Sequence, residues 1–320
     1  MSFIKLGIKY TLHTRLIAIL VVVFPFVGVF DYWILNLAIH FTPYWFWYSL
    51  FFCILGLLWK DRIITTISII CGCGHLIILT ADLTFDDLDF PDQNRSFEVL
   101  SLNVDHKNKS YGQIASKVVG LNSDIVVLTE INRKLEIELQ GMESEYQKYI
   151  VHSNKGFGVA VYSRFPIKKC RAHLYIKRDI PTVHCYLLVY GKEMSLWAIH
   201  PPTPLRMAHK SQRDFIFGEV AESIADDSSL RMIVGDFNTT PWGDNLEIFK
   251  NSGMRASMDG LLGILAGTGS FPAWLPIRIL IDNVMYGSHL GEISRHYVDG
   301  VGSDHLGLVV RLSFNPESIP

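Results

Sequence analysis

The chain has 320 residues, of which 49% are hydrophobic, and it carries a formal net charge of −2 with a positive mean hydropathy. This is more apolar than a soluble protein of the same length needs, and the near-zero charge argues against a protein that grips the phosphates of a long nucleic acid. The apolar excess lies in the first 81 residues. Between Leu16 and Ala81 the only formal charges are those of Asp31, Lys60, Asp61 and Arg62.

Three uncharged stretches in this first part of the chain predict transmembrane helices, because a span takes about 20 mostly apolar residues. They run over roughly Leu16–Ile39, Tyr44–Trp59 and Ile63–Thr80, and the start of the short middle one could reach back to Phe41. A cleaved signal peptide is a poor alternative, since the apolar zone extends far past the hydrophobic region of such a peptide. A buried hairpin of a soluble protein is the other alternative. An aromatic belt at one membrane interface is indicated by Tyr44, Trp45, Trp47 and Tyr48.

Basic residues set the expected orientation, because cytoplasmic loops carry an excess of Lys and Arg. Lys5, Lys9 and Arg15 precede the first span, and Lys60 and Arg62 lie between the second and the third. Both places should therefore be cytoplasmic, and three spans put the rest of the chain outside the cytoplasm. The sequence thus predicts a multi-pass protein of the cell membrane whose water-soluble domain is extracytoplasmic. Two spans would put that domain inside, so this prediction depends on the span count.

The composition changes after the third span and predicts three parts. Residues 1–81 form a membrane domain, residues 82–96 an acidic linker, and residues 97–320 a water-soluble domain large enough for one core. Five of the 29 basic and seven of the 31 acidic residues precede Arg95, which leaves 24 of each from Arg95 to the end of the sequence. This neutral domain lacks the basic excess of proteins that bind long nucleic acids, although such a partner is not excluded.

The five cysteines fall into two groups. Cys53, Cys71 and Cys73 lie in the membrane domain and are most simply packing residues. Cys170 and Cys185 lie in the soluble domain, on two segments that could pair as neighbouring strands. A disulfide between them would suit an oxidising compartment, but the sequence does not give the separation of their Cα atoms, so the pairing stays open.

The soluble domain has mostly strand patterns, with two helix patterns between them. Strands are predicted at Phe97–Val104, Asp124–Glu130, Phe157–Ser163, Thr182–Tyr190, Met194–His200, Leu230–Phe237, Arg278–Tyr286 and Leu306–Ser313. The helices are predicted at Tyr111–Leu121 and Arg206–Ala225. Leu261–Leu275 is predicted to be an apolar, Gly-rich loop.

Polar side chains recur at or near the ends of these strands. In Met232–Pro241, M-I-V-G-D-F-N-T-T-P, Gly235 is expected to let the backbone turn, and Asp236 and Asn238 share one face of an extended chain. A carboxylate beside a carboxamide can orient a water and hold a phosphate oxygen. Taken singly, such residues are usually turns or caps, but six such places beside apolar runs are hard to explain by turns alone. The residues are Asn103, Glu130, His200, Asp236, Asn238, Asp282, Asp304 and His305.

The order L-N-V, L-T-E, S-R-F-P, a strand-end His, G-D-F-N, I-D-N and S-D-H resembles the endonuclease/exonuclease/phosphatase superfamily. That superfamily includes deoxyribonuclease I, apurinic endonucleases, neutral sphingomyelinases and inositol polyphosphate 5-phosphatases. The resemblance covers about Phe97–Phe314; G-D-F-N with S-D-H is specific, and S-R-F-P is weaker. It implies an α/β fold, a four-layer sandwich of two mixed β-sheets flanked by helices (DNase I-like), preceded here by the three transmembrane helices. It also implies hydrolysis of a phosphoester or phosphoanhydride with Mg²⁺ or Mn²⁺.

Carried over by motif, the resemblance makes Glu130 the main metal ligand, with Asn103 and Asp304 nearby. Oxygen donors of this kind suit Mg²⁺, which keeps several waters and shares phosphate oxygens. Asp105 lies two residues after Asn103, where some members carry a second carboxylate. Asn283 departs from the pattern, since many relatives have a His after the Asp of the I-D-N motif.

The resemblance also assigns the reacting groups. His305, oriented by Asp282, is expected to be the general base or a phosphate contact. Asp236 is expected to position or deprotonate the attacking water. Asn238 and His200 are expected to hold the phosphoryl oxygens as charge builds in the transition state.

The family does not fix the substrate, but three features favour a phosphate linked to a lipid. They are the membrane tether, the neutral domain and the apolar loop Leu261–Leu275, for which ordinary core packing is the alternative. The architecture looks similar to that of the VanJ/teicoplanin-resistance-type membrane proteins, and that resemblance suggests a polyprenyl (undecaprenyl) pyrophosphate. The enzyme alternatives are an extracytoplasmic nuclease or phosphodiesterase and a sphingomyelinase-like phospholipase C. A membrane-anchored interaction protein with a decayed site is the alternative outside enzymes, and the intact acid, amide and His set argues against it.

Overall fold

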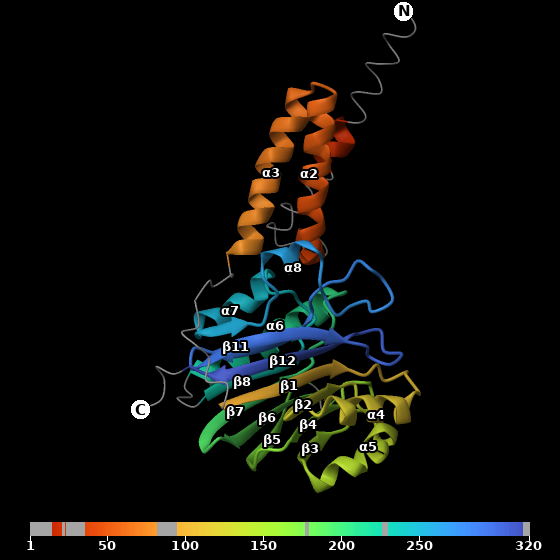
Figure 1. The fold of residues 1–320 in the computed structure, drawn as a ribbon, viewed down its shortest axis with the longest axis vertical. Coiled ribbons are helices and arrows are strands. Elements are labelled where there is room, and N and C mark those ends of the chain that lie inside the picture. The colour runs from red at the N-terminus through yellow and green to blue at the C-terminus, as the bar shows by residue number, and fades with distance from the viewer. Residues whose placement is uncertain are drawn as a thin grey trace, which may run out of the picture. The chain divides into compact units, whose positions relative to one another are not determined.

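The computed structural model describes residues 15–20, 23, 36–81, 95–176, 179–225 and 230–315, and the chain divides into two compact units (Figure 1). Met1–Thr84 and Asp259–Gly267 form the first, here named the helical unit. Phe85–Met258 and Thr268–Pro320 form the second, named the sheet unit. Most of the predicted linker, residues 82–94, lies outside the described residues, so the predicted domain boundaries stay predictions.

Two long apolar helices make up most of the helical unit. A short 3-10 helix, Asn36–Phe41, leads into α2 (Thr42–Leu58), and a tight turn connects α2 to α3 (Arg62–Thr80). Asp61 caps α3 because its side chain accepts hydrogen bonds from the backbone N–H groups of Ile63 and Ile64. In the described part of the chain, Leu37–Leu58 and Arg62–Thr80 are the helices long and apolar enough to cross a membrane.

These two helices coincide with the second and third predicted spans. The first predicted span, Leu16–Ile39, falls largely on residues 21–22 and 24–35, which lie outside the described residues, so the count of three stays a prediction. The alternative of a buried soluble hairpin is disfavoured, because less than a third of the apolar 18-residue stretch of each helix is buried inside the protein. Large apolar side chains that face outward include Leu57, Leu58, Ile70 and Ile77.

Two six-stranded sheets make up the centre of the sheet unit. The first has the order β11-β12-β1-β2-β4-β3 and the second the order β5-β6-β7-β8-β10-β9. Both are mixed, because β1 runs parallel to β2 and β7 runs parallel to β8, whereas the other neighbours are antiparallel. The first sheet consists of β1 (Ser96–Asn103), β2 (Ile125–Thr129), β3 (Gln147–Val151), β4 (Val159–Ser163), β11 (Leu290–Val298) and β12 (Gly307–Phe314). The second consists of β5 (Ile167–Ile176), β6 (Ile180–Val189), β7 (Lys192–Ile199), β8 (Leu230–Asp236), β9 (Met254–Ala256) and β10 (Asp282–Gly287).

Three apolar clusters hold the layers of the sheet unit together. The largest contains inward side chains of both sheets, such as Val99, Leu196 and Val234, and lies between them. The second joins the first sheet to α4 (Tyr111–Leu121) and α5 (Arg133–Glu138), and the third joins the second sheet to α6 (Met207–Ala225) and α7 (Glu247–Asn251). The predicted pair of mixed sheets flanked by helices is therefore confirmed.

Two local interpretations of the sequence were wrong. Gly235 makes no turn, because β8 continues through it to Asp236. Its φ is +144°, and a Cβ there would collide with the carbonyl oxygen of Ile199 on the neighbouring strand, so glycine allows β7 and β8 to approach. The apolar segment Leu261–Leu275 is not all loop, since it begins with a short helix, α8 (Leu261–Leu265).

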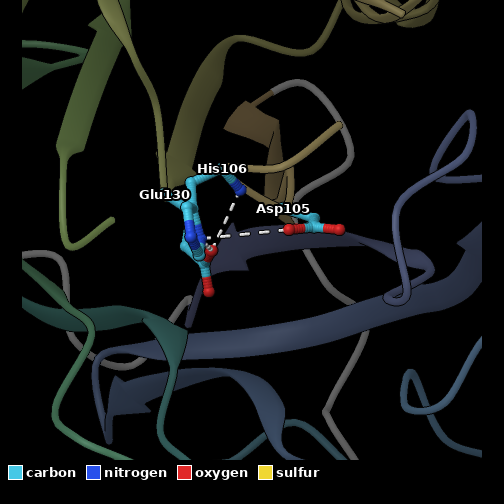
Figure 2. Close-up of side chains that lie close together, drawn as sticks. All are labelled: Asp105, His106 and Glu130. Atoms are coloured by element: carbon cyan, nitrogen blue, oxygen red, sulfur yellow. Dashed lines mark hydrogen bonds and ion pairs between the residues drawn. The ribbon is translucent and has the colours of Figure 1, made fainter. Parts of the chain in front are cut away.

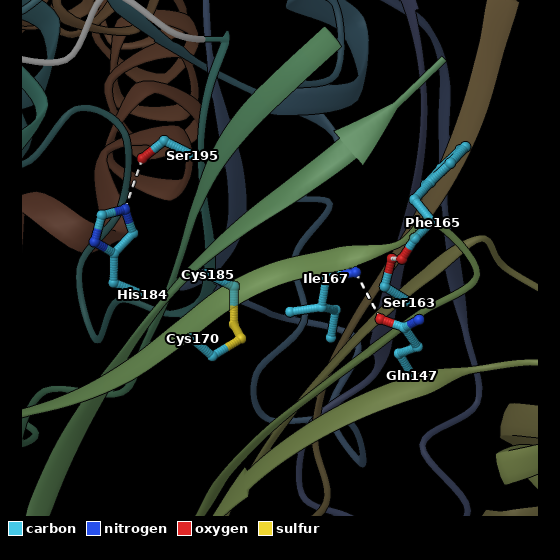
Figure 3. The surroundings of a disulfide bond; sticks show 8 residues. All are labelled: Gln147, Ser163, Phe165, Ile167, Cys170, His184, Cys185 and Ser195. Carbon is cyan, nitrogen blue, oxygen red and sulfur yellow. Dashed lines mark hydrogen bonds between the residues drawn. A yellow bond between two sulfur atoms is a disulfide. The ribbon is translucent and has the colours of Figure 1, made fainter. Parts of the chain in front are cut away.

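A disulfide joins Cys170 on β5 to Cys185 on β6, two residues that lie directly opposite each other in the strand pairing (Figure 3). Their Cα atoms are 4.1 Å apart. The pairing that the sequence left open is therefore present, and the two segments are neighbouring strands as expected. The other three cysteines are free.

Replacing both Cys170 and Cys185 by alanine is expected to lower the free energy of unfolding by about 3 kcal/mol, because a bridge across some 15 residues restricts the unfolded chain by roughly that amount. Chemical denaturation of the protein in detergent, with and without a thiol reductant, measures the effect. The reductant should lower the midpoint of the wild type and of a Cys53→Ala control equally, and leave the double variant unchanged. Identical wild-type midpoints in the two conditions would contradict the prediction.

Candidate active site

The strand directions bring the predicted site residues to one end of the sandwich. The parallel pairs β1–β2 and β7–β8 end there, and the antiparallel strands β10 and β12 begin there. The register places Asp236, the last residue of β8, opposite Asp282, the first residue of β10. At or next to these strand ends lie Asn103, Glu130, His200, Asp236, Asp282 and His305. The two sheets thus bring together residues that are up to about 200 positions apart in the sequence.

Asn103 connects the two sheets at this end. Its side-chain Nδ2 donates to Oε1 of Glu130 at 3.0 Å and to Oδ2 of Asp236 at 3.1 Å. His200 lies against the same two carboxylates, with Nε2 at 3.7 Å from Glu130 Oε1 and at 3.6 Å from Asp236 Oδ2. Asn103, His200 and Asp236 are buried. The carboxamide therefore fixes the distance between a carboxylate of the first sheet and one of the second.

His305 and Asp282 form a buried dyad. Nδ1 of His305 lies 2.6 Å from Oδ2 of Asp282, which leaves Nε2 3.8 Å from Oδ2 of Asp236. The ring of Phe271 packs against the imidazole with 4.9 Å between ring centroids. The other carboxylate oxygen of Asp282, Oδ1, is buried and has no hydrogen-bond partner in the described part of the chain. The dyad therefore holds the imidazole in one orientation.

Asn238 and Asp304 complete the predicted set but lie further from its centre. The backbone N–H of Asn238 donates to Asp236 Oδ1 at 2.9 Å, and its side-chain Nδ2 donates to the carbonyl of Pro201 at 3.0 Å. Asp304 is half exposed, and its Oδ1 lies 3.9 Å from Nε2 of His305. All eight predicted residues thus lie in one region. The individual roles assigned to them stay predictions.

His106 is a site residue that the sequence interpretation missed. Its backbone N–H donates to Oε2 of Glu130 at 3.0 Å, and its ring Nδ1 lies 2.6 Å from the same oxygen (Figure 2). The ring is also 3.9 Å from Oδ1 of Asp105. The backbone is left-handed at Asp105 and at Glu130, with φ of +53° and +63°, just after the ends of β1 and β2. The available signal was the position of His106 directly after Asp105.

Burial and neighbouring charges shift the pKa values of Asp236, His305 and His200. Burial raises the pKa of Asp236, and the nearby charge of Asp282 raises it further. Burial alone would lower the pKa of His305, but the carboxylates of Asp282 and Asp236 outweigh it and raise that pKa to about 10. Burial lowers the pKa of His200 to about 4. At neutral pH, His305 is therefore charged and His200 neutral.

Glu130 is held as a carboxylate. Burial would raise its pKa, but the proton that His200 carries in acid and the hydrogen bonds from His106 and Asn103 outweigh burial and lower the pKa. Its side chain is 18% exposed, so one edge remains open to solvent. An anionic, partly open carboxylate is the form that binds a divalent cation.

Two groups of side chains have ligand atoms within 4.8 Å of one another. Asp105, His106 and Glu130 form the first and are partly exposed; Asp236, Asp282 and His305 form the second and are buried. The first group offers two carboxylates beside open solvent, which fits a hard cation that keeps waters and shares phosphate oxygens. Asp304, a predicted ligand, belongs to neither group among the described residues.

Comparison with known proteins identifies the family. Residues 100–305 match the sequence model of the Endonuclease/Exonuclease/phosphatase family. The structure is similar to truncated TDP2 from Caenorhabditis elegans, with 16% identity, a TM-score of 0.54, and coverage of 69% of this chain and 98% of that one. It is also similar to the human Nocturnin catalytic domain with bound sulfate, with 16% identity, a TM-score of 0.56, and coverage of 69% of this chain and 95% of that one. A third similar structure is an endonuclease/exonuclease/phosphatase from Beutenbergia cavernae, with 18% identity, a TM-score of 0.55, and coverage of 69% of this chain and 72% of that one. A search of curated proteins found no significant match.

At these identities the solved structures show the fold alone, whereas the sequence match spans most of the chain. Members of the matched family hydrolyse phosphoester bonds, and they generally use divalent metals. The oxygen-rich group around Glu130 is compatible with that general requirement. From the motif order, the paired sheets and the family match together, this chain belongs to the endonuclease/exonuclease/phosphatase family.

Proposed function

We propose that the protein is a membrane-anchored, divalent-metal-dependent phosphohydrolase that acts outside the cytoplasm on a lipid-linked phosphate such as a polyprenyl pyrophosphate. One observation carries the hydrolase part: Asn103 bridges Glu130 and Asp236 beside the His305–Asp282 dyad. Glu130, the carboxylate proposed for the cation, and Asp236, the carboxylate proposed for the attacking water, are thus held by the same Asn103 side chain. Two apolar helices of spanning length in the same chain support the membrane anchor.

In this mechanism Asp105 and Glu130 hold the cation, with His106 fixing the orientation of Glu130. The cation supplies Lewis-acid neutralisation of the phosphate charge. Asp236 accepts the proton of the attacking water, since its Oδ2 faces the same space as Nε2 of His305. The Asp282 carboxylate keeps Nε2 of His305 directed at the phosphoryl group.

The extracytoplasmic location is supported by the disulfide and by the basic turn of the hairpin. Cys170 and Cys185 are bonded in the sheet unit, and disulfides persist in oxidising compartments outside the cytoplasm. Lys60 and Arg62 lie in the turn between α2 and α3, at the end of the hairpin expected to be cytoplasmic. The end of α3, from which the chain continues toward the sheet unit, is then on the other side.

The substrate class is tested by a panel offered to the purified full-length protein in detergent with Mg²⁺ or Mn²⁺. The panel contains a polyprenyl pyrophosphate, sphingomyelin, supercoiled plasmid and a soluble aryl phosphodiester. We expect the highest kcat/KM for the polyprenyl pyrophosphate. Plasmid cleavage at a comparable rate would replace the lipid interpretation by a nuclease. A protein of similar fold, D. rerio TDP2, has been solved in complex with a single-strand DNA product. Turnover of no phosphoester would favour an interaction protein.

Replacing His106 by alanine is expected to weaken Mn²⁺ binding by roughly 10-fold to 100-fold, because a group that orients a ligating carboxylate typically has an effect of that size. Isothermal titration calorimetry of the metal alone measures it. His106→Asn should recover part of the affinity, since its Nδ2 can donate to Glu130 in place of the ring, and His296→Ala on the exposed edge strand β11 is the control. Unchanged affinity in His106→Ala would remove His106 from the site.

A further inference from the structure

The segment Asp259–Gly267 belongs to the helical unit although it is inserted between β9 and β10 of the sheet unit. Its helix α8 packs against α2 and α3 (Figure 1). The indole Nε1 of Trp47 donates to the carbonyl of Leu265 at 2.5 Å, and the hydroxyl of Tyr44 donates to the carbonyl of Gly267 at 3.3 Å. The segment is therefore held by aromatic side chains of the first turns of α2.

These contacts identify the end of the hairpin at which α8 lies. A tight turn connects α2 to α3, so the start of α2 and the end of α3 share the end opposite that turn. The turn contains Lys60, and α3 begins with Arg62, whereas Tyr44 and Trp47 are at the opposite end. Tyr and Trp concentrate at membrane interfaces, and basic residues mark the cytoplasmic side. By these criteria α8 lies at the outer interface.

The composition of α8 fits an apolar environment on its outer face. Asp259 is the one charged residue between positions 259 and 267. Ile264 is buried within the structure, whereas Leu262 is 84% exposed. A single exposed leucine is ordinary on a soluble protein. Here the exposed leucine lies on a charge-poor helix that packs against the aromatic end of an apolar hairpin. The partner expected to cover this leucine is therefore the lipid of the outer leaflet.

The residues of the sheet unit that flank the inserted segment are hydrogen-bonded to the start of β10. Before it, the backbone N–H of Ser257 donates to Asn283 Oδ1 at 3.0 Å, and Asn283 Nδ2 donates back to the carbonyl of Ser257 at 3.1 Å. After it, the hydroxyl of Ser270 accepts from the backbone N–H of Asp282 at 3.3 Å. Only three peptide units join Gly267 to Ser270, a chain length of at most about 11 Å.

We propose that α8 inserts into the outer interface of the bilayer and that the segment Asp259–Gly267 thereby tethers the sheet unit, to which it is joined through the flanking residues Ser257 and Ser270, to the membrane surface. The surface that contacts lipid is formed by Leu261, Leu262 and Leu265. This inference rests on the proposed function and narrows it: the substrate is a phosphate attached to a lipid embedded in the leaflet, and a soluble phosphodiester is cleaved without help from α8.

The placement of α8 is tested by electron paramagnetic resonance on the full-length protein in phosphatidylcholine–phosphatidylglycerol liposomes. A nitroxide is attached through Leu262→Cys in a background in which Cys53, Cys71 and Cys73 are alanine. The control is Leu174→Cys on the edge strand β5, where the native side chain is 46% exposed. We expect the label at position 262 to be reached by oxygen and shielded from a water-soluble nickel chelate, and the control to show the reverse. Equal access of the nickel chelate to both labels would overturn the proposal.

The coupling to catalysis is tested with Leu262→Glu and the matched surface variant Leu174→Glu. Leu262→Glu should lower kcat/KM for a polyprenyl pyrophosphate in liposomes at least about 10-fold, because a charge must then enter the interface. It should leave hydrolysis of the soluble aryl phosphodiester unchanged, as should Leu174→Glu for both substrates. Equal losses on both substrates, or none on the lipid, would overturn the coupling. If the wild type hydrolyses neither substrate, the proposed function fails while the nitroxide measurement still decides where α8 lies.

Discussion

Glu130→Gln is expected to lower kcat/KM for phosphate release by about 10³-fold or more. The substitution keeps the size of the side chain and removes the charge that would hold the cation, whose Lewis-acid contribution is several kcal/mol, and each 1.36 kcal/mol changes the rate tenfold. Glu130 is the carboxylate on which Asn103, His106 and His200 converge. The substitution should also weaken Mn²⁺ binding. Steady-state kinetics at saturating Mn²⁺ measure the loss of rate, and calorimetry measures the loss of metal affinity.

The matched control is Glu138→Gln, a carboxylate on the exposed side of α5. It should change neither the rate nor the metal affinity. A Glu130→Gln enzyme that keeps wild-type affinity for Mn²⁺ would show that the cation is held elsewhere, and the buried group of Asp236, Asp282 and His305 would then be the first place to look.

Asp236→Asn is expected to lower kcat by about 10²-fold to 10⁴-fold, the range typical of losing a positioned general base. The carboxamide has nearly the same shape, and its oxygen can still accept the backbone N–H of Asn238. It cannot take a proton from water. Because Asp236 lies outside the open group at Glu130, the affinity for Mn²⁺ should stay within a few-fold of the wild type.

Single-turnover kinetics with bound metal separate this effect from product release, and the thermal unfolding midpoint verifies that the fold is kept. Asp299→Asn, on an exposed carboxylate that caps the loop before His305, is the control and should be neutral. The two site variants thus have different signatures: Glu130→Gln loses rate and metal, and Asp236→Asn loses rate alone. A loss of metal affinity in Asp236→Asn would place the cation between the two sheets.

The strands that the sequence pattern missed share a physical feature. β3 and β11 are the edges of the first sheet, β5 and β9 are the edges of the second, and of these only the β5 segment was suggested, through Cys170. Edge strands pack on one side and carry charged residues outward, as Lys168, Lys169 and Arg171 do on β5. Their apolar alternation is therefore interrupted. The central strands, buried on both faces, have continuous apolar runs and were predicted within a few residues.

The residues of the candidate site that could be predicted from the sequence also differ from the one that could not in the kind of segment they occupy. The eight predicted residues stand beside apolar runs, so strand direction alone brings them to one end of the sandwich. His106 stands in a polar loop with no periodic pattern, and its approach to Glu130 depends on left-handed backbone at Asp105 and Glu130. Composition does not specify that conformation, because non-glycine residues adopt it only where the surrounding structure imposes it.

The sequence by itself determined the apolar hairpin, the central strands and the order of acid, amide and imidazole groups, because these depend on local hydrophobic runs and short motifs. The tertiary structure alone decided that Asn103 bridges the two sheets, that Cys170 faces Cys185, and that Asp259–Gly267 packs with α2 and α3. Each of these joins segments that are distant in the chain or that could pair in more than one register. Their proximity is fixed only when the two sheets pack face to face and every strand takes its final neighbours.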